Sequence, residues 1–235
     1  MKRRELKKHI LTSLQEKPWP AVAEELARFQ EKVVINHLFT ALCHPNEFCK
    51  WHGVSGFGTV VASLAQKDAE AARIVMRRFL WNLNDESGGI GWGIPEAMGE
   101  VMAHNDMLFD EYHHMLLSYM REDGPEIYAN GNYLELPALQ RGVLWGVARL
   151  IDSRPQEMIA LRVAEDVCKY LSSDDQVVRA MASWCIGLCG EGQCLEAIKA
   201  LYDNPVVFTF YWHNTFEEIS VGAMAQRALS LVRLS

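Results

Sequence analysis

The sequence lacks any apolar run long enough to cross a membrane and any apolar leader after its start. A membrane-spanning helix needs about 18 or more apolar residues in succession, and here a basic start leads into a mixed segment. We therefore expect a cytoplasmic protein without a membrane partner. In a reducing compartment cysteines stay free thiols, which is the expectation for Cys43, Cys49, Cys168, Cys185, Cys189 and Cys194.

Excess positive charge is lacking too, since the formal net charge is −7. Residues 2–8 hold five basic side chains and Glu5, and the remaining chain has 18 basic against 29 acidic side chains. A body of that charge repels phosphate backbones, so a nucleic acid is not the expected partner. The basic start is either a solvated first helical turn or a contact for an acidic partner.

What the sequence does contain is a repeat. In four segments small and apolar residues lead to a glycine, at spacings of 41, 47 and 41 residues, and a fifth copy places Ser230 at the glycine position. Units of two helices with a period of about 40–47 residues are typical of HEAT and armadillo arrays. The anchoring glycines are Gly58, Gly99, Gly146 and Gly187.

Each repeat predicts a helix that carries its glycine internally. Ala182, Cys185, Ile186 and Cys189 fall at positions i, i+3, i+4 and i+7, which is one helical face. An internal glycine costs a helix about 1 kcal/mol relative to alanine. Its recurrence therefore indicates close approach between neighbouring helices at the same point of every unit.

Capping residues and prolines predict where further helices begin. Residues 121–137 contain Gly-Pro and Asn-Gly turns, and this insertion explains the longer spacing. The predicted helices are 2–16, 21–42, 69–83 capped by Asp68, 107–120 capped by Asp106, 156–171 with Pro155 in its first turn, and one through Gly99 with Pro95 in its first turn. We expect one domain over 1–235, with a helical cap at 1–48 and repeats at 49–235.

Residues 175–190 resemble the HEAT-like repeat named after phycobilisome lyases, whose unit runs D-x-x-V-R-x-x-A-x-x-x-L-G-x-x-G. Only this unit matches closely, and the wider superfamily resemblance covers about residues 50–235. The resemblance implies an all-α fold, a right-handed α-α superhelix or HEAT/armadillo-like solenoid of about four to five helical hairpins. The matching positions are Asp175, Val178, Arg179, Ala182, Ile186, Gly187 and Gly190.

The resemblance leaves several functions open, because a fold does not fix a function. Similar repeats occur in adaptors, chromophore lyases, deoxyhypusine hydroxylases and DNA alkylation-repair glycosylases. The hydroxylases carry His-Glu pairs as iron ligands, and this chain has no such pair. The glycosylases line a basic groove with Trp and Asp, which an acidic body disfavours.

Two tryptophans define the predicted binding surface. Trp51 and Trp92 each precede their anchoring glycine by seven residues, so they are equivalent positions in adjacent units. Side by side, they would form an aromatic pocket for a peptide, a cofactor or a cationic group. The alternative is that both indoles pack between units and satisfy their N–H groups locally. The candidate surface is Trp51, His52, Trp92 and Glu96.

Two groups have the residue types of a metal site. The first has one Glu-x-x-His segment, whereas di-iron bundles use two, so a solvated face is the favoured interpretation. The second has soft ligands but matches no common zinc motif, so packing thiols are favoured. The first group is Glu100, His104, Glu111 and His114, and the second is Cys43, His44, Cys49 and His52.

Two more segments are open to alternative interpretations. The glycine-rich residues 88–93 precede a helix but match no nucleotide motif, so an inter-repeat loop is favoured over a phosphate site. The aromatic residues 205–213 form either an exposed partner patch or a plug over the last hairpin, and we favour the plug.

Together these patterns predict a non-enzymatic scaffold that binds a protein partner and needs no cofactor. The first alternative is a metal- or cofactor-dependent enzyme, including a lyase that handles a chromophore or cofactor. The second alternative is a DNA alkylation-repair glycosylase on the same fold.

Overall fold

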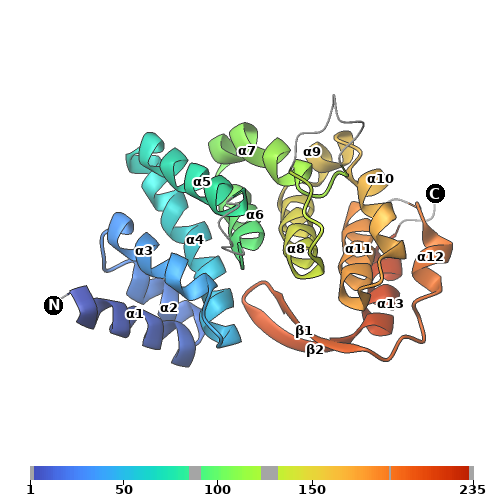
Figure 1. Ribbon diagram of the computed structural model, residues 1–235, viewed down its shortest axis with the longest axis horizontal. Coiled ribbons are helices and arrows are strands. Elements are labelled where there is room, and N and C mark those ends of the chain that lie inside the picture. Colours follow the sequence, from blue (N-terminus) through green and yellow to red (C-terminus); the bar gives the residue numbers. More distant parts are fainter. Residues whose placement is uncertain (1–2, 85–90, 123–131, 191, 233–235) are drawn as a thin grey trace. The chain divides into compact units, whose positions relative to one another are not determined.

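The computed structural model describes residues 3–84, 91–122, 132–190 and 192–232 (Figure 1). The chain divides into two compact units, unit 1 over Met1–His113 and unit 2 over His114–Ser235. Helices dominate both units, which confirms the predicted all-α class of stacked helical hairpins. Within the described ranges, none of the helices combines the length and the apolar character needed to cross a membrane.

Unit 1 follows the predicted helix pattern with one break. The predicted helix over 69–83 is confirmed with the same bounds, whereas that over 21–42 is wrong as a single helix because the backbone at Gln30 is extended and begins a new one. The helices are α1 (Arg3–Glu16), α2 (Trp19–Leu26), α3 (Glu31–Leu42), α4 (Glu47–Lys67), α5 (Ala69–Leu83), α6 (Ile94–Ala103) and α7 (Asp106–Ser118), whose last turns belong to unit 2.

Side-chain caps explain the helix starts in unit 1. Asn46 Oδ1 accepts the Cys49 N–H at 2.9 Å to begin α4, and Asp68 Oδ1 accepts the Ala71 N–H at 2.9 Å to begin α5. The predicted Asp106 cap is wrong by one residue. Asn105 Oδ1 accepts the Leu108 N–H at 3.0 Å, so α7 starts directly after Asn105.

Helix α4 is the centre of unit 1, because it packs against α1, α2, α3, α5 and α6. Its Phe57 ring lies 4.9 Å from both Phe39 on α3 and Phe79 on α5, measured between ring centroids. These edge-to-face contacts join three helices in one apolar core.

At two of the four anchoring glycines, the inner helices approach closely as predicted. A Cβ atom on Gly58 would lie 2.8 Å from Glu100 Cγ on α6, and one on Gly187 would lie 2.6 Å from the Ala228 carbonyl oxygen. Each of these two glycines thus faces the inner helix of the next repeat. Gly99 and Gly146 are also buried, in α6 and α8 respectively.

In unit 2, α11 packs between α8 and α13. The predicted helix over 156–171 is wrong as one element, because Arg162 adopts a left-handed conformation (φ 55°) that ends one helix and starts another. The elements are α8 (Pro137–Ser153), α9 (Pro155–Ala160), α10 (Val163–Cys168), the 3₁₀ helix η1 (Lys169–Ser172), α11 (Gln176–Cys189), α12 (Leu195–Lys199), β1 (Val207–Trp212), β2 (Thr215–Ser220) and α13 (Val221–Leu231).

The aromatic segment 205–213 contains a strand that the sequence analysis missed. β1 and β2 form an antiparallel hairpin from Val207↔Ser220 to Trp212↔Thr215. Its two-residue turn needs two left-handed residues, which His213 (φ 46°) and Asn214 (φ 63°) supply.

The β1–β2 hairpin lies against the inner helices α8 and α11 of unit 2 (Figure 1). Trp145 on α8 donates its indole N–H to the Tyr211 carbonyl at 2.7 Å. The Trp212 ring lies 5.8 Å from the Trp145 ring and 5.7 Å from the Trp184 ring of α11. Phe210 and Tyr211 are buried in this contact, whereas Val206 and Val207 are exposed, so the segment is core only at its end.

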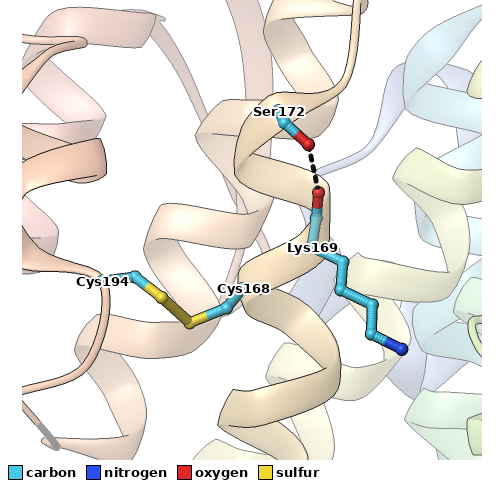
Figure 2. Close-up of a disulfide and its surroundings, with 4 residues drawn as sticks. All are labelled: Cys168, Lys169, Ser172 and Cys194. Atoms are coloured by element: carbon cyan, nitrogen blue, oxygen red, sulfur yellow. Dashed lines mark hydrogen bonds between the residues drawn. A yellow bond between two sulfur atoms is a disulfide. The ribbon is translucent and has the colours of Figure 1, made fainter.

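A disulfide corrects the expectation of six free thiols. Cys168 at the end of α10 is bonded to Cys194 before α12, with Cα atoms 6.3 Å apart (Figure 2). Cys43 is a free, exposed cysteine, whereas Cys49, Cys185 and Cys189 are free and buried, as packing cysteines are expected to be. The bond ties the short α12 to α10.

Gly187→Ala is expected to lower the free energy of unfolding by about 1–2 kcal/mol. Overpacking against the backbone of Ala228 costs about 1–3 kcal/mol, and the better helix propensity of alanine offsets up to about 1 kcal/mol. Urea unfolding monitored by circular dichroism measures the change. Gly192→Ala is the control, because its Cβ would meet only Leu195 Cδ1 at 3.9 Å. Equal stability of the two variants would contradict close approach at Gly187.

Reduction of the Cys168–Cys194 bond is expected to destabilise the chain by roughly 3 kcal/mol, because the bond closes a loop with a sequence separation of 26 residues. Urea unfolding with and without dithiothreitol measures the loss. Cys168→Ser should behave like the reduced chain, whereas Cys43→Ser should keep the full response to reductant. Six reactive thiols in the unreduced protein would refute the bond.

Candidate functional site

The four predicted surface residues lie on α4, on α6 and in the turn before α6, all in unit 1. Trp51 and His52 lie in the second turn of α4, Glu96 lies in the first turn of α6, and Trp92 lies in the turn before α6. Helices α4 and α6 pack against each other. Trp51 is 8% exposed and Trp92 is 39% exposed, so only Trp92 presents a large part of its ring to solvent.

His52 does not belong to a binding surface, which corrects its assignment. Its Nδ1 lies 2.8 Å from the Leu14 carbonyl oxygen of α1. Because a carbonyl oxygen only accepts, Nδ1 carries the proton. The ring also contacts Trp19 at 5.9 Å and Phe48 at 6.1 Å, and burial lowers the pKa of His52. His52 is therefore a neutral packing residue that joins α4 to α1.

Trp51 matches the predicted alternative of a locally satisfied indole. Its Nε1 donates to Glu47 Oε2 at 3.1 Å, one helical turn earlier. The Lys50 ammonium lies 5.0 Å from the centroid of the Trp51 ring, within the range of a cation–π contact. The Lys50 side chain therefore packs against the Trp51 ring.

Glu96 is the most unusual group of this face. It is 5% exposed, and its Oε1 lies 3.6 Å from the Lys50 Nζ. Its Oε2 is buried and has no hydrogen-bond partner among the residues that the structure describes. A buried carboxylate oxygen left unpaired costs several kcal/mol. The position therefore favours a donor that comes from outside unit 1.

A second carboxylate lies one helical turn further along α6. Glu100 is buried like Glu96, and both follow from the i, i+4 spacing on one helical face. His104 Nδ1 lies 2.9 Å from the Glu100 carbonyl oxygen and 3.6 Å from Glu100 Oε1. Glu96 and Glu100 thus place two buried carboxylates on one face of α6.

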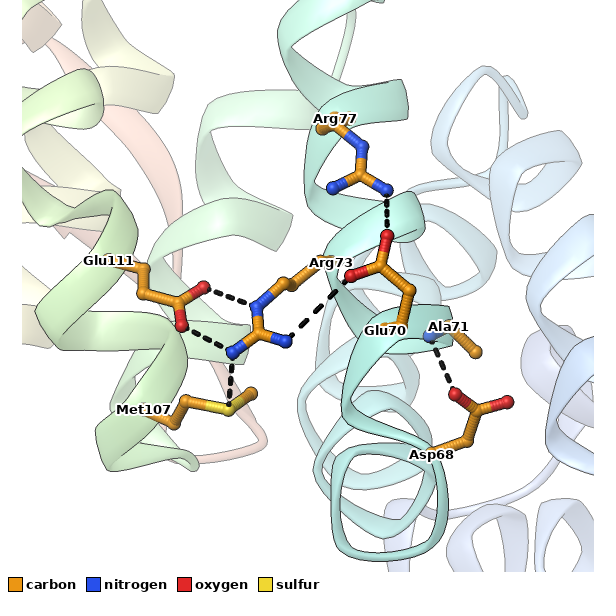
Figure 3. Close-up of polar contacts among 7 residues, drawn as sticks. All are labelled: Asp68, Glu70, Ala71, Arg73, Arg77, Met107 and Glu111. Atoms are coloured by element: carbon orange, nitrogen blue, oxygen red, sulfur yellow. Dashed lines mark hydrogen bonds and ion pairs between the residues drawn. The ribbon is translucent and has the colours of Figure 1, made fainter.

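The predicted metal cluster is not assembled. Glu111 on α7 is held by Arg73 on α5, with Nε–Oε2 at 2.8 Å and Nη2–Oε1 at 2.6 Å, and Arg73 lowers the pKa of Glu111 (Figure 3). His104 contacts Glu100 instead, and His114 is exposed. Across the described ranges, no three His, Cys, Asp or Glu side chains are placed to hold a metal ion.

The possible zinc ligands near residue 43 are dispersed as well. Cys43 is exposed, whereas Cys49 is buried, and this burial raises the pKa of Cys49 to about 11. His44 Nδ1 accepts the Asn46 N–H at 3.1 Å, and His52 is engaged with Leu14. A thiol with that pKa is not a ready thiolate ligand.

The glycine-rich segment 88–93 is described only in part. Residues 88–90 lie outside the described residues, and Gly91, Trp92 and Gly93 form a turn into α6. Gly93 has a φ of 71° and caps α6, and a Cβ there would lie 3.1 Å from Leu42 Cδ2. Glycine at this position lets the turn pack against α3.

Sequence reasoning missed Lys50 and Arg73. Lys50 directly precedes Trp51, but its contact with Glu96 joins helices 46 positions apart. Arg73 and Glu111 are 38 positions apart. Nothing in the local spacing marks either pair, although the unit period of about 41 residues offers a weak signal.

Comparison with known proteins gives the fold and no family. No family profile and no curated sequence matches the chain. A designed armadillo repeat protein is similar with a TM-score of 0.51 and 15% identity, over 99% of this chain and 95% of that one. Computationally designed armadillo repeat proteins for modular peptide recognition are similar with a TM-score of 0.51 and 14% identity, over 98% of this chain and 93% of that one. The chain therefore has an armadillo/HEAT-type helical-repeat fold.

The buried His52 is expected to make stability depend on pH. Its folded pKa lies below the unfolded value of about 6.5, so on acidification the unfolded chain binds a proton first and stability falls below pH 6.5. The slope contributed is at most about 1.4 kcal/mol per pH unit. Urea unfolding between pH 7.5 and 5.0 should show a steeper loss for the native chain than for His52→Gln. Parallel profiles would contradict the assignment.

Proposed function

We propose that this chain is a non-enzymatic scaffold whose α4–α6 face binds a basic segment of a partner protein. The α4–α6 face is defined as Lys50, Trp51, Trp92, Glu96 and Glu100. One observation carries the proposal, namely the buried Glu96 Oε2, which accepts no hydrogen bond from any described residue. A lysine or arginine side chain would supply the missing donor.

The charge arrangement favours a cation over other ligands. Glu96 and Glu100 are one turn apart on α6; Lys50 Nζ lies 3.6 Å from Glu96 Oε1, and His104 Nδ1 lies 3.6 Å from Glu100 Oε1. A guanidinium has five N–H donors in a planar fork, so it can bridge carboxylate oxygens that an ammonium would contact singly. The formal net charge of −7 also accelerates encounter with a basic partner.

Trp92 supplies the apolar part of the same contact. Its ring is 39% exposed at the start of α6, four positions before Glu96. Basic side chains have long apolar stems that pack on aromatic rings while the charged head reaches a carboxylate. The α4–α6 face thus combines an aromatic platform with a buried acceptor.

The structural relatives support the class of ligand. Armadillo repeat proteins designed for modular peptide recognition share this fold. Stacked inner helices offer a long face on which an extended segment can lie. We take a peptide segment, rather than a small molecule, as the ligand of the α4–α6 face.

Other predictions remain proposals. They are a single repeat domain over 1–235 with a cap at 1–48, and the phycobilisome-lyase type of the repeat at 175–190. A cytoplasmic location also remains a proposal, and it loses part of its basis because Cys168 and Cys194 are bonded. The metal-enzyme alternative is weakened because Arg73 engages Glu111, one of its proposed ligands. No specific observation favours a glycosylase.

Glu96→Gln is expected to weaken binding of basic decapeptides at least 10-fold, because it removes the buried negative charge while keeping the side chain's shape. An array of decapeptides with zero to four Lys or Arg residues, followed by fluorescence polarisation at two salt concentrations, measures the effect. Affinity should rise with peptide charge and fall with salt.

The matched control is Glu70→Gln, which removes the same charge from an exposed position on α5. This variant should bind as the native chain does. Circular dichroism verifies that both variants are folded. Equal binding by Glu96→Gln and the native chain, or preference for neutral peptides, would exclude the α4–α6 face as the site.

A further inference from the structure

A second surface of unit 1 lies away from the α4–α6 face, between α3 and α5. It contains a cavity of about 230 Å³, which we call the α3–α5 groove. Its walls are mostly apolar, so water is a poor occupant of this space. The lining residues used here are Ile35 and Phe39 of α3, Leu64 of α4, and Ile74, Val75 and Arg78 of α5.

The helix α5 carries an exposed apolar stripe along this groove. Ile74 is 55% exposed and Trp81 is 75% exposed. With Arg78 they occupy positions i, i+4 and i+7, which lie on one helical face. At 1.5 Å per residue the stripe is about 10 Å long, or two helical turns. Large apolar side chains gathered beside a cavity are typical of a protein contact surface.

Arg78 stands between the two apolar residues without a counter-charge. Its guanidinium carbon lies 3.7 Å from the centroid of the Phe39 ring, and its Nη1 donates to Asn36 Oδ1 at 3.0 Å. In the part of unit 1 that the structure describes, no carboxylate forms an ion pair with Arg78. Burial lowers the pKa of Arg78, and no nearby acid offsets this effect.

The neighbouring cations are all paired, which sets Arg78 apart. On the same helix, Arg73 binds Glu111 at 2.6 Å and Arg77 binds Glu70 at 2.5 Å (Figure 3). At the other side of the groove, Lys32 binds Asp68 at 2.9 Å. The groove therefore presents one unneutralised guanidinium, already oriented by a ring and an amide, within an apolar surface.

We propose that the α3–α5 groove binds an amphipathic helix of a partner protein, whose apolar side chains fill the groove and whose carboxylate pairs with Arg78. A partner helix presents side chains at i, i+3, i+4 and i+7, which matches the two-turn length of the stripe. A carboxylate suits the planar guanidinium because it accepts two parallel hydrogen bonds. The hollow form of this surface disfavours a flat lipid membrane as the occupant. This inference does not rest on the proposed function.

The test is selection of displayed 14-residue helical peptides against the full chain, with four positions of one peptide face randomised. We expect selected peptides to carry three apolar residues and one Asp or Glu on that face. Their affinity should fall at least 10-fold with Arg78→Glu and with Ile74→Asp. A peptide in which Lys replaces the acid should regain binding to Arg78→Glu.

Arg77→Glu is the matched control, because it makes the same charge change one residue away at a side chain already paired with Glu70. Its peptide affinity should stay within twofold of the native value, and circular dichroism verifies folding of every variant. Selection of no peptide, selection of basic peptides, or equal loss with Arg77→Glu would overturn the proposal.

Two further results would assign the surface to another occupant and so overturn the proposal as well. One is sedimentation with phosphatidylcholine–phosphatidylglycerol vesicles that is lost in Trp81→Ala. The other is a dimer in analytical ultracentrifugation that Ile74→Asp dissociates.

Discussion

Each of the two units depends on the close approach of two inner helices at a glycine. Gly58 lies against Glu100 of the next inner helix, and Gly187 lies against the backbone of Ala228. Without a Cβ atom the helix axes come near enough for the flanking apolar residues to interdigitate at the density of a protein interior. The helix propensity lost at each glycine is small beside the apolar area that this packing buries.

The same approach creates the chemistry of the α4–α6 face. Because α6 packs closely on α4 at Gly58, Glu96 and Glu100 are drawn out of solvent, and Lys50 comes within reach of Glu96. Burial turns ordinary surface carboxylates into strong acceptors, since fewer water molecules compete with an incoming donor. In unit 1 the packing of α6 on α4 therefore both stabilises the scaffold and favours a cationic ligand.

Unit 2 uses a different device to protect its inner helices. The hairpin β1–β2 places Phe210 and Trp212 against Trp145 and Trp184, and the Trp145 N–H is satisfied by a hairpin carbonyl. The disulfide at Cys168 ties down the short α12, which is too short to be stable alone. In unit 2, the β1–β2 hairpin and the disulfide-linked α12 therefore stand where a regular repeat would have a pair of long helices.

The periodic glycines and capping residues were sufficient to predict the helical-repeat class, the bounds of α5 and the close helix approach at Gly58 and Gly187, because these depend on local spacing. Spacing predicted equivalent positions for Trp51 and Trp92, whereas Trp51 lies within α4 and Trp92 in the turn before α6. It failed for His52, which is turned toward Leu14, and for Glu111, which is held by Arg73. It failed as well for the strand in 205–213 and for the pairing of Cys168 with Cys194. The hairpin is local, but its turn residues His213 and Asn214 are not the Asn-Gly or Asp-Gly pair that marks such a turn in a sequence. The other three outcomes required the tertiary structure, because which groups meet across 26–38 residues is decided by how helices pack and not by the residues adjacent in the chain.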